Sequence, residues 1–322
     1  MEAFTPETVA RHAEMLGNRV KKRQAHFAKR YAREGIEAYR LYDWDIPEIR
    51  AVVDWYAGRV VVAEDERLQH GPDYLPAMAR AVGEALGVPP DGVFQRRRHT
   101  AVDGGPRYRE LAREGGKFTV RERELLFLVN LTDRLDTGLF SDHRDTRRLV
   151  QQLAAGADFL NLYAYTGAFT CAAAAGGALT TTTVDRSATY LDWTRSNLEV
   201  NGLGGARHKM VQADSMKYLE GAAEAGSRFT LAFVDPPSFS GTTEAGTTFE
   251  ILRDHPALLR RVLAVMAPGG TVFFSANHQR FEPALDDLPA AKIEEITNAT
   301  LPEDYRNSRG RLTHRCWRIT AP

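Results

Sequence analysis

Hydrophobic side chains recur at helical spacing early in the chain. Leu16, Val20, Phe27 and Tyr31 are separated by four, seven and four residues, which places them on one face of a helix. Gly35 follows this pattern, and glycine is a common helix stop. We therefore predict an amphipathic helix that turns these four side chains inward and leaves most of its charged residues in solvent.

Short apolar runs separated by turn residues fill the rest of the first 130 residues. They predict strands, two of them joined at Ala57-Gly58, and one segment of helical period that ends at Gly87. The expected strands cover residues 38–43, 51–63 (as a pair), 92–98 and 117–130, and the expected helix covers residues 74–86. Residues 1–130 therefore read as a small α+β domain.

Strand and helix patterns alternate from about residue 134 onward. Strands are expected at residues 159–162, 181–184, 208–212, 231–234 and 271–275, helices at 168–175, 189–201, 215–225 and 255–266, and two closing strands at 292–297 and 312–320. Such alternation is typical of a parallel sheet with helices on both faces. We predict an α/β domain over residues 131–322, with a Rossmann-like, doubly wound, mostly parallel sheet of seven strands.

Charge is balanced overall, with 42 lysines and arginines against 42 aspartates and glutamates. This balance excludes a protein that coats nucleic acid through net charge alone, so any basic surface must be local. Residues 19–33 hold cations without a carboxylate between them, and a second cluster lies at residues 96–98. These positions are candidates for RNA phosphate contacts, with an ordinary solvated face as the alternative: Arg19, Lys21, Lys22, Arg23, Lys29, Arg30, Arg96, Arg97 and Arg98.

The cysteine and histidine patterns point away from disulfides and metals. Cys171 and Cys316 are the only cysteines and lie far apart, and the nine histidines show no metal-binding spacing. No apolar run approaches the roughly 18 residues of a membrane span, and the first residues lack the features of a signal peptide. We expect a cytoplasmic protein without a bound metal.

Polar residues follow the predicted parallel strands at the point where each strand ends, which is where open α/β sheets bind ligands. The first strand runs into a turn, residues 161–167, that contains Gly167 but no G-x-G-x-x-G loop. Asp185 ends the second strand, where a carboxylate can accept both hydroxyls of a ribose. Asp214 ends the third, placed to accept from an adenine amine. Either aspartate could instead be an ordinary helix cap.

The fourth strand ends in the more specific pentapeptide Asp235-Pro236-Pro237-Ser238-Phe239. Two consecutive prolines fix the backbone and supply no N–H groups, so the carbonyls beside them need donors from elsewhere. An aromatic ring two residues later offers a stacking face for a planar base. The set predicts a nucleoside-containing cofactor and a planar heterocyclic acceptor.

These strand ends resemble those of the class I S-adenosylmethionine-dependent methyltransferases of ribosomal RNA. Further segments, at residues 18–48, 136–144, 182–185, 197–203, 212–214, 274–275 and 316–317, resemble the RlmK-like family of 23S rRNA guanine-N7 methyltransferases, the C-terminal half of the fused RlmKL enzymes. The N-terminal half of those enzymes has no counterpart here, so its guanine-N2 activity is not implied. The loop at residues 242–248 also departs from the pattern expected after the two prolines.

The resemblance implies S-adenosylmethionine as cofactor and a set of residues around it. The implied cofactor-binding residues are Phe140, His143, Arg144, Asn161, Tyr163, Tyr165, Thr166, Gly167, Asp185, Arg186, Ser187, Asp214, Ser215 and Asp235. The implied catalytic residues are Asp235, Pro236, Pro237 and Phe239. The implied partner is 23S rRNA or a large-subunit assembly intermediate, without a membrane or an obligate protein partner.

The sequence leaves the atom that accepts the methyl group open, but the possible acceptors differ in the chemistry that they need. Guanine N7 carries no proton, so its methylation needs no general base and depends on proximity, orientation and electrostatics. Transfer to an exocyclic amine such as guanine N2 would use the same Asp-Pro-Pro geometry. Transfer to cytosine C5 needs a cysteine thiolate at a strand end, and neither Cys171 nor Cys316 occupies one. The alternative outside catalysis is an RNA-binding protein on a methyltransferase scaffold.

Overall fold

The computed structural model describes residues 4–65, 67, 69–98, 116–132, 136–240, 248–306 and 310–322. The chain divides into two compact units, one of Met1–Thr137 with Glu303–Arg311 and one of Gly138–Pro302 with Leu312–Pro322. The loop at residues 242–248, after the two prolines, lies outside the described residues except for Thr248.

The first unit begins with the predicted amphipathic helix, α1 (Pro6–Glu34). The prediction that Leu16, Val20, Phe27 and Tyr31 face inward is confirmed, because all four are buried. The helix starts well before the basic segment, since the Thr5 side chain caps it and a proline occupies its first turn. Gly35 ends it in the left-handed conformation, as predicted.

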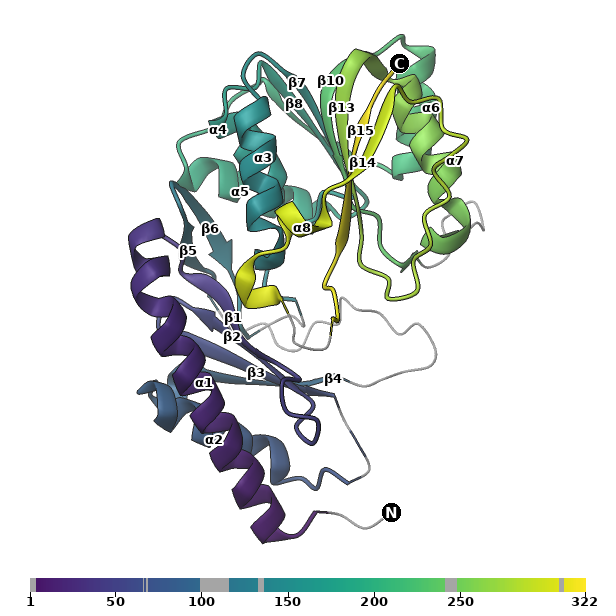
Figure 1. Ribbon diagram of the computed structural model, residues 1–322. Helices are drawn as coiled ribbons and strands as arrows, with labels where there is room; N and C mark the ends of the chain where they lie inside the picture. The colour runs from purple at the N-terminus through teal and green to yellow at the C-terminus, as the bar shows by residue number, and fades with distance from the viewer. Residues whose placement is uncertain are drawn as a thin grey trace. The chain divides into compact units, whose positions relative to one another are not determined.

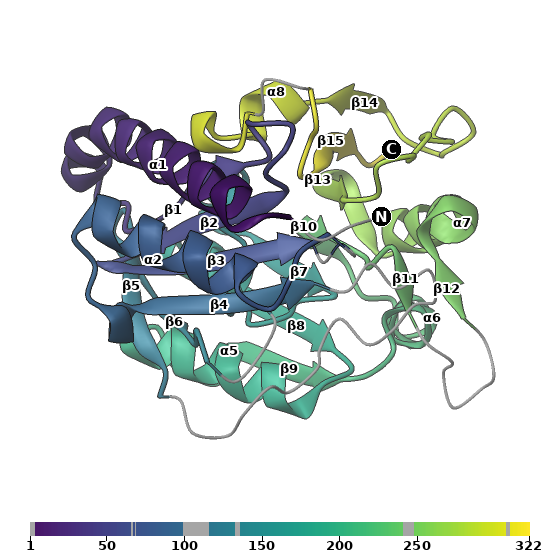
Figure 2. The same cartoon turned by 90° about the horizontal axis from the view of Figure 1, so that it is seen from below.

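The sheet of the first unit has four strands in the order β1-β2-β3-β4 (Ala38–Asp43, Ala51–Tyr56, Arg59–Asp65 and Val93–Arg98). Helices α1 and α2 (Tyr74–Leu86) share one apolar core with it, and Figure 2 shows both on the same face. The 3₁₀ turn η1 (Pro90–Gly92) leads into β4, and β5 (Phe118–Glu122) pairs with β6 (Leu125–Val129) as a separate hairpin. These strands and this helix match the predicted ones closely.

A late segment of the chain, Glu303–Arg311, belongs to the first unit, which no local pattern indicated. Its 3₁₀ turn η3 (Glu303–Tyr305) carries Asp304, which is buried. The Asp304 carboxylate accepts hydrogen bonds from the Tyr31 hydroxyl at 2.8 Å and from the Arg40 backbone N–H at 2.9 Å. A buried carboxylate is stable only with such donors, so these contacts fix the segment in place.

The second unit confirms the predicted fold. Its seven strands lie in the order β14-β15-β13-β10-β7-β8-β9, with β15 antiparallel to both neighbours and the five strands from β13 to the β9 edge parallel. Helices α3, α4 and α5 cover one face and α6 and α7 the other (Figure 1). The strands are β7 (Asp158–Leu162), β8 (Thr180–Asp185), β9 (His208–Gln212), β10 (Phe229–Val234), β13 (Met266–Ala276), β14 (Lys292–Glu295) and β15 (Arg315–Thr320).

The helices of the second unit differ from the predictions in three places. Helix α3 was not predicted. Helix α7 ends before residue 266, the predicted end, because β13 starts at Met266. Thr297, which was expected to end a strand, is the first residue of α8. The bounds are α3 (Arg144–Leu153), α4 (Ala168–Ala175), α5 (Ala188–Val200), α6 (Ser215–Glu224), α7 (Ile251–Ala264) and α8 (Thr297–Thr300). The 3₁₀ turn η2 (Ser141–His143) precedes α3, and β11 (Phe239–Ser240) pairs with β12 (Phe249–Glu250) before α7.

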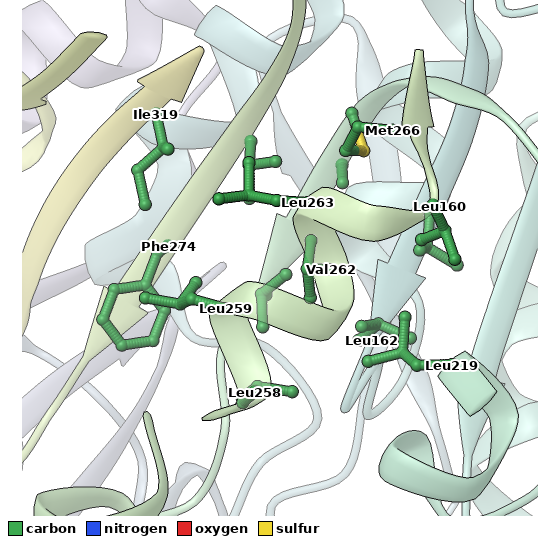
Figure 3. Close-up of a cluster of buried hydrophobic side chains, with 14 of the residues drawn as sticks. Leu160, Leu162, Leu219, Leu258, Leu259, Val262, Leu263, Met266, Phe274 and Ile319 are labelled. Atoms are coloured by element: carbon green, nitrogen blue, oxygen red, sulfur yellow. The ribbon is translucent and has the colours of Figure 1, made fainter. Parts of the chain in front are cut away.

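Alternate residues of the central strands pack into cores on both faces of the sheet. Leu160 and Leu162 of β7 meet leucines of α7 and Phe274 of β13 on one face (Figure 3). Phe159 packs with the opposite core, against α3 and α4. A parallel sheet buried on both faces holds its strands rigidly, and this rigidity positions the loops that follow them. Among the described helices, none is long and apolar enough to cross a membrane.

Candidate active site

The carboxyl ends of β8, β7, β10 and β13 form one edge of the sheet. Val184 pairs with Leu162, Leu162 with Val234, and Val234 with Phe274. The residues that follow each strand are therefore neighbours in space, although they are far apart in sequence. The predicted strand-end residues meet at this edge.

The turn after β7 has an uncommon backbone. Tyr163, Tyr165 and Gly167 all have positive φ, at 55°, 51° and 71°. Such a conformation costs about 1–2 kcal/mol for a residue with a side chain, and it persists only where surrounding contacts impose it. Asn197 supplies one of these contacts, because its Nδ2 donates to the Thr166 carbonyl at 2.8 Å. Strained, over-determined turns of this kind are concentrated at ligand sites.

Gly167 is required at its position for two reasons. Its φ is positive, and a Cβ added there would lie 2.2 Å from Cγ2 of Thr194 in α5. The start of α4 can therefore approach α5 only with glycine at this position. The Thr166 hydroxyl holds the same turn in place by donating to the Gly138 carbonyl at 2.6 Å.

Asp185 holds two backbone segments together at the end of β8. Its Oδ2 accepts from the Tyr165 N–H at 2.9 Å and its Oδ1 from the Ser187 N–H at 2.8 Å. Ser187, rather than Asp185, caps α5, because its side chain accepts from the Tyr190 N–H. Burial raises the pKa of the Asp185 carboxyl, and the backbone hydrogen bonds act against that rise. Each carboxylate oxygen keeps a lone pair that can accept a ribose hydroxyl.

Asp214 does cap the following helix, as the simpler interpretation expected. Its Oδ1 accepts from the Met216 N–H at 3.0 Å and the Lys217 N–H at 3.2 Å. Both bonds use one oxygen, so capping leaves the other oxygen available for a ligand. Ser215 is buried in the first turn of α6, whereas Arg186, beside Asp185, is exposed.

The remaining predicted cofactor residues divide into exposed and buried side chains. Phe140 is 44% exposed, and its ring lies 5.1 Å from that of Tyr165. Asn161 and Arg144 are buried, at 1% and 2% exposure. Asn161 Nδ2 donates to the Thr170 hydroxyl at 3.0 Å beneath the turn. Arg144 donates to the Ser141 carbonyl in η2, and a cofactor contact of Asn161 and Arg144 stays a prediction.

The Asp-Pro-Pro segment leads from β10 into the short ribbon of β11 and β12. Pro236 is buried and Pro237 is half-buried. The Ser238 carbonyl accepts from the Ile251 N–H at 3.1 Å, and its hydroxyl donates to Oδ1 of Asn277 at 2.8 Å. These bonds fix the segment and leave Phe239 52% exposed, which is high for an aromatic side chain. An exposed, fixed aromatic ring beside the strand end fits the predicted stacking role.

Asp235 sits among polar groups that come from other parts of the second unit. His143 Nε2 lies 3.7 Å from Asp235 Oδ2 and 3.5 Å from the Ser275 hydroxyl at the end of β13. Burial raises the pKa of the Asp235 carboxyl to about 6, and a hydrogen bond from Ser275 acts against the rise. Sequence reasoning did not assign a role to Ser275, although its place at a strand end could have indicated one.

Three side chains here have potential metal-ligand atoms within 4.8 Å of one another: Asp142, His143 and His314. The two imidazole rings stack face to face, with centroids 4.0 Å apart and planes 23° apart. Nitrogen lone pairs lie in the ring plane, so stacked rings direct them alongside one another rather than toward a shared ion. His314 Nδ1 lies 3.1 Å from Asp142 Oδ2. This geometry fits a hydrogen-bonded histidine–carboxylate pair.

The predicted RNA-binding residues in the first unit are only partly available. Lys21, Lys22 and Lys29 of α1 are exposed and form no ion pair with any residue in the described ranges. Arg19 pairs with Asp45 at 2.5 Å, Arg30 pairs with Glu303 at 2.7 Å, and Arg23 donates to the Asp304 carbonyl at 3.1 Å.

The second basic cluster, on β4, is also partly engaged. Arg97 pairs with Glu64 at 3.1 Å. Arg96 is 7% exposed, and its guanidinium donates to the Gln95 and Leu131 carbonyls. In this arrangement the Arg96 guanidinium is turned toward the backbone, and a phosphate contact of Arg96 stays a prediction. The Arg98 side chain lies outside the described part.

The sequence is similar to known proteins over most of its length. A family described as S-adenosylmethionine-dependent methyltransferase matches residues 44–297. Two curated relatives, from Syntrophotalea carbinolica (42% identical over 311 residues) and Magnetococcus marinus (43% over 317 residues), are named ribosomal RNA large subunit methyltransferase K/L. The alignments cover 95% and 96% of this chain but 43% of each relative, so the chain spans less than half of their length.

Solved structures share the fold at low sequence identity. The crystal structure of SMU.776 complexed with SAH superposes with a TM-score of 0.76 at 23% identity, covering 97% of this chain and 81% of that one. A SAM-dependent methyltransferase from Agrobacterium tumefaciens has a TM-score of 0.61 at 19% identity, covering 84% of this chain and 87% of that one. The likeness extends to both units, because each alignment covers most of the chain.

Proposed function

The chain belongs to the S-adenosylmethionine-dependent methyltransferase family, and from this premise we propose that it methylates N7 of a guanine in 23S ribosomal RNA. The names of the two curated relatives support ribosomal RNA as the substrate. The RlmK-like segments of the sequence support guanine N7 as the acceptor. The proposal concerns this chain alone, which matches less than half of those relatives.

One observation carries the proposal: a carboxylate and an exposed aromatic ring lie at the same strand end, held by two prolines. Asp235 has an oxygen, Oδ1, that is buried and forms no hydrogen bond within the described part of the chain. Phe239, four residues on, is exposed. A guanine stacked on the ring would bring its imidazole toward the carboxylate, which would stabilise the positive charge that N7 methylation creates. No proton leaves, so no general base is needed.

The residues at the other strand ends fit S-adenosylmethionine, which supplies the methyl group. Asp185 would accept from the ribose hydroxyls through the lone pairs that its backbone bonds leave free. Asp214 would accept from the adenine amine through the oxygen that does not cap α6. Phe140 and Tyr165 would cover the nucleoside with their neighbouring rings.

The two cysteines argue against transfer to cytosine C5. Cys171 in α4 and Cys316 in β15 are both fully buried, and the chain has no others. Burial raises the pKa of Cys171 to about 12 and also raises that of Cys316. A thiol that is buried and protonated cannot attack a base. Guanine N2 remains the competing acceptor, and the identity of the product distinguishes it.

The first unit would contribute the electrostatic contacts to RNA. Lys21, Lys22 and Lys29 are predicted RNA contacts of α1 that are exposed and lack ion-pair partners among the described residues. Contacts to phosphates position RNA without reading its sequence. The substrate would be 23S rRNA or a large-subunit assembly intermediate, and the location would be the cytoplasm, where ribosomes are assembled.

A methyl-transfer assay tests the proposal. The purified chain is incubated with labelled S-adenosylmethionine and 23S rRNA from a strain that lacks the modification. We expect incorporation into one nucleotide, a large loss for Asp235→Asn, and retained activity for the matched Cys171→Ala and Cys316→Ala variants. If the chain binds S-adenosylmethionine but transfers no label, it is an RNA-binding protein on a methyltransferase scaffold and the proposal fails.

A further inference from the structure

Behind Asp235, in the second unit, lies a buried group of polar side chains to which the proposed transfer assigns no step. It consists of Asp142 and His143 from η2, Ser275 from β13, His314 just before β15, and Thr300 from α8. All five are buried, which is costly for polar groups unless their hydrogen bonds are satisfied. We therefore asked what this arrangement does for the carboxylate in front of it.

Geometry places His143 between this group and Asp235. Its Nε2 lies 3.7 Å from Asp235 Oδ2, and its side chain is 5% exposed against 21% for Asp235. The rings of Phe169 and Phe233 meet the imidazole edge to face, with centroids 5.8 Å away in both cases. The His143 imidazole is thus in contact with two aromatic rings.

His314 fixes the His143 ring from a third side by stacking on it at 4.0 Å. Both nitrogens of His314 are engaged, Nδ1 with Asp142 Oδ2 at 3.1 Å and Nε2 with the Thr300 hydroxyl at 3.2 Å. Asp142 is the residue before His143 in η2. The turn that carries His143 is therefore tied, through Asp142, to the ring that supports His143.

We propose that His143 is a positioning residue: as a neutral imidazole it donates from Nε2 to the Ser275 hydroxyl, 3.5 Å away, and so directs the proton of this hydroxyl to Asp235, which keeps the carboxylate ionised. His314 and Asp142 hold the donor in place. The inference rests on the proposed function, because it assigns a task to Asp235 in transfer. It differs from the cofactor contact that the sequence resemblance implies for His143.

The electrostatics of the cluster agree with a neutral donor. Burial lowers the pKa of His143 well below its usual value, and the neighbouring His314 and Arg147 lower it further, whereas Asp142 raises it. A neutral imidazole has one N–H, and Nε2 is the nitrogen that faces two oxygen atoms. Nδ1 is buried and makes no hydrogen bond within the described residues.

The groups around Asp235 shift the ionisation of its carboxyl in opposite directions. The Ser275 hydrogen bond and the charge of His314 favour the ionised carboxylate, while burial and the charge of Asp142 oppose it. On β15, the buried thiol of Cys316 is kept protonated by its own burial and by the charge of Asp235. Without the Nε2 donor, the Ser275 hydroxyl loses the partner that orients it toward Asp235, which should favour the protonated carboxyl.

The pH dependence of single-turnover transfer tests the proposal. The rate should be flat from about pH 7 to 9 and fall below about pH 6, as Asp235 gains a proton. In His143→Phe the acid limb should move up by about one pH unit or more, because the Ser275 hydroxyl is no longer held in its hydrogen bond to the charged carboxylate. In His143→Gln, whose amide nitrogen can replace Nε2, the limb should return toward its original position.

A matched control separates positioning from general destabilisation. His255 is another buried histidine of the same unit, with hydrogen bonds to the Ile251 carbonyl and the Ala284 N–H. His255→Phe should lower stability without moving the acid limb. If His143→Phe does not fold, His143→Asn takes its place, since the shorter amide cannot reach the Ser275 hydroxyl.

Carbon-13 NMR titration of the Asp235 carboxyl, on the chain without RNA, tests the inference apart from activity. The titration midpoint should rise in His143→Phe and return in His143→Gln. A midpoint that is unchanged in His143→Phe overturns the inference, even if guanine N7 is the acceptor. Conversely, transfer to a different atom overturns the proposed function, while the titration still decides the role of His143.

Discussion

Replacing Asp185 with alanine should remove most of the affinity for S-adenosylmethionine. If its carboxylate accepts two ribose hydroxyls, each at about 1.5 kcal/mol or more for a charged acceptor, the loss is about 3 kcal/mol. Every 1.4 kcal/mol corresponds to a factor of ten, so the dissociation constant should rise about 100-fold.

The same substitution also removes an acceptor from two backbone N–H groups, those of Tyr165 and Ser187. We expect the free energy of unfolding to fall by about 2–3 kcal/mol. The free energy of unfolding of such domains is typically about 5–15 kcal/mol, so the variant should remain folded. Affinity can then be measured on native protein by calorimetry, and stability by urea unfolding.

Asp158 offers a matched control for this measurement. It starts β7, at the opposite end of the strands, and accepts from the Thr180 hydroxyl at 2.7 Å. Asp158→Ala makes the same change in charge and should leave the affinity for S-adenosylmethionine unchanged. An affinity of Asp185→Ala within twofold of the parent would refute the ribose assignment and reduce Asp185 to a structural link between two turns.

Three further predictions concern the turn, the RNA surface and the stacking ring. Gly167→Ala should destabilise the chain by about 2–4 kcal/mol, from positive φ and the clash with α5, and weaken cofactor binding; unchanged urea unfolding would contradict this. Replacing Lys21, Lys22 and Lys29 together with glutamine should reduce the slope of log affinity for RNA against log salt concentration by about two, since each neutralised phosphate on a single strand contributes roughly 0.7. An unaltered slope would mean that these lysines form only a solvated face. Phe239→Ala should lower turnover at least about fivefold without changing cofactor affinity, because stacking on a base is worth about 1–3 kcal/mol; unchanged turnover would exclude a stacking role.

Local pattern predicted much of the fold. The segment at residues 74–86, which Gly87 follows, is helix α2, and residues 38–43 are β1. These predictions were confirmed because helix caps, turns and the spacing of apolar residues are encoded locally in the sequence. The same reasoning placed Asp185, Asp214 and Asp235 at one edge of a sheet, since carboxyl ends of parallel strands meet there. The groups that these three aspartates contact could not be predicted from local sequence pattern.

Long-range contacts explain what the sequence did not reveal. Residues 19–33 hold no carboxylate, yet Asp45 and Glu303 pair with two of the cations in this segment from elsewhere in the chain. Helix α3 was missed because its buried face is partly polar, with Thr146 and Arg147 inside. His314 stacks on His143 across more than half of the chain, and no local pattern indicates such a contact.

The identity of the methylated nucleoside tests the central claim most directly. Nucleosides from 23S rRNA treated with the purified chain are separated and identified by mass spectrometry, and the RNA is reduced with borohydride and treated with aniline. N7-methylguanosine carries a fixed positive charge that makes its imidazole ring and glycosidic bond labile, so we predict this nucleoside and strand scission at one position. A neutral methylguanosine or 5-methylcytidine, at a position that resists scission, would contradict N7 as the acceptor.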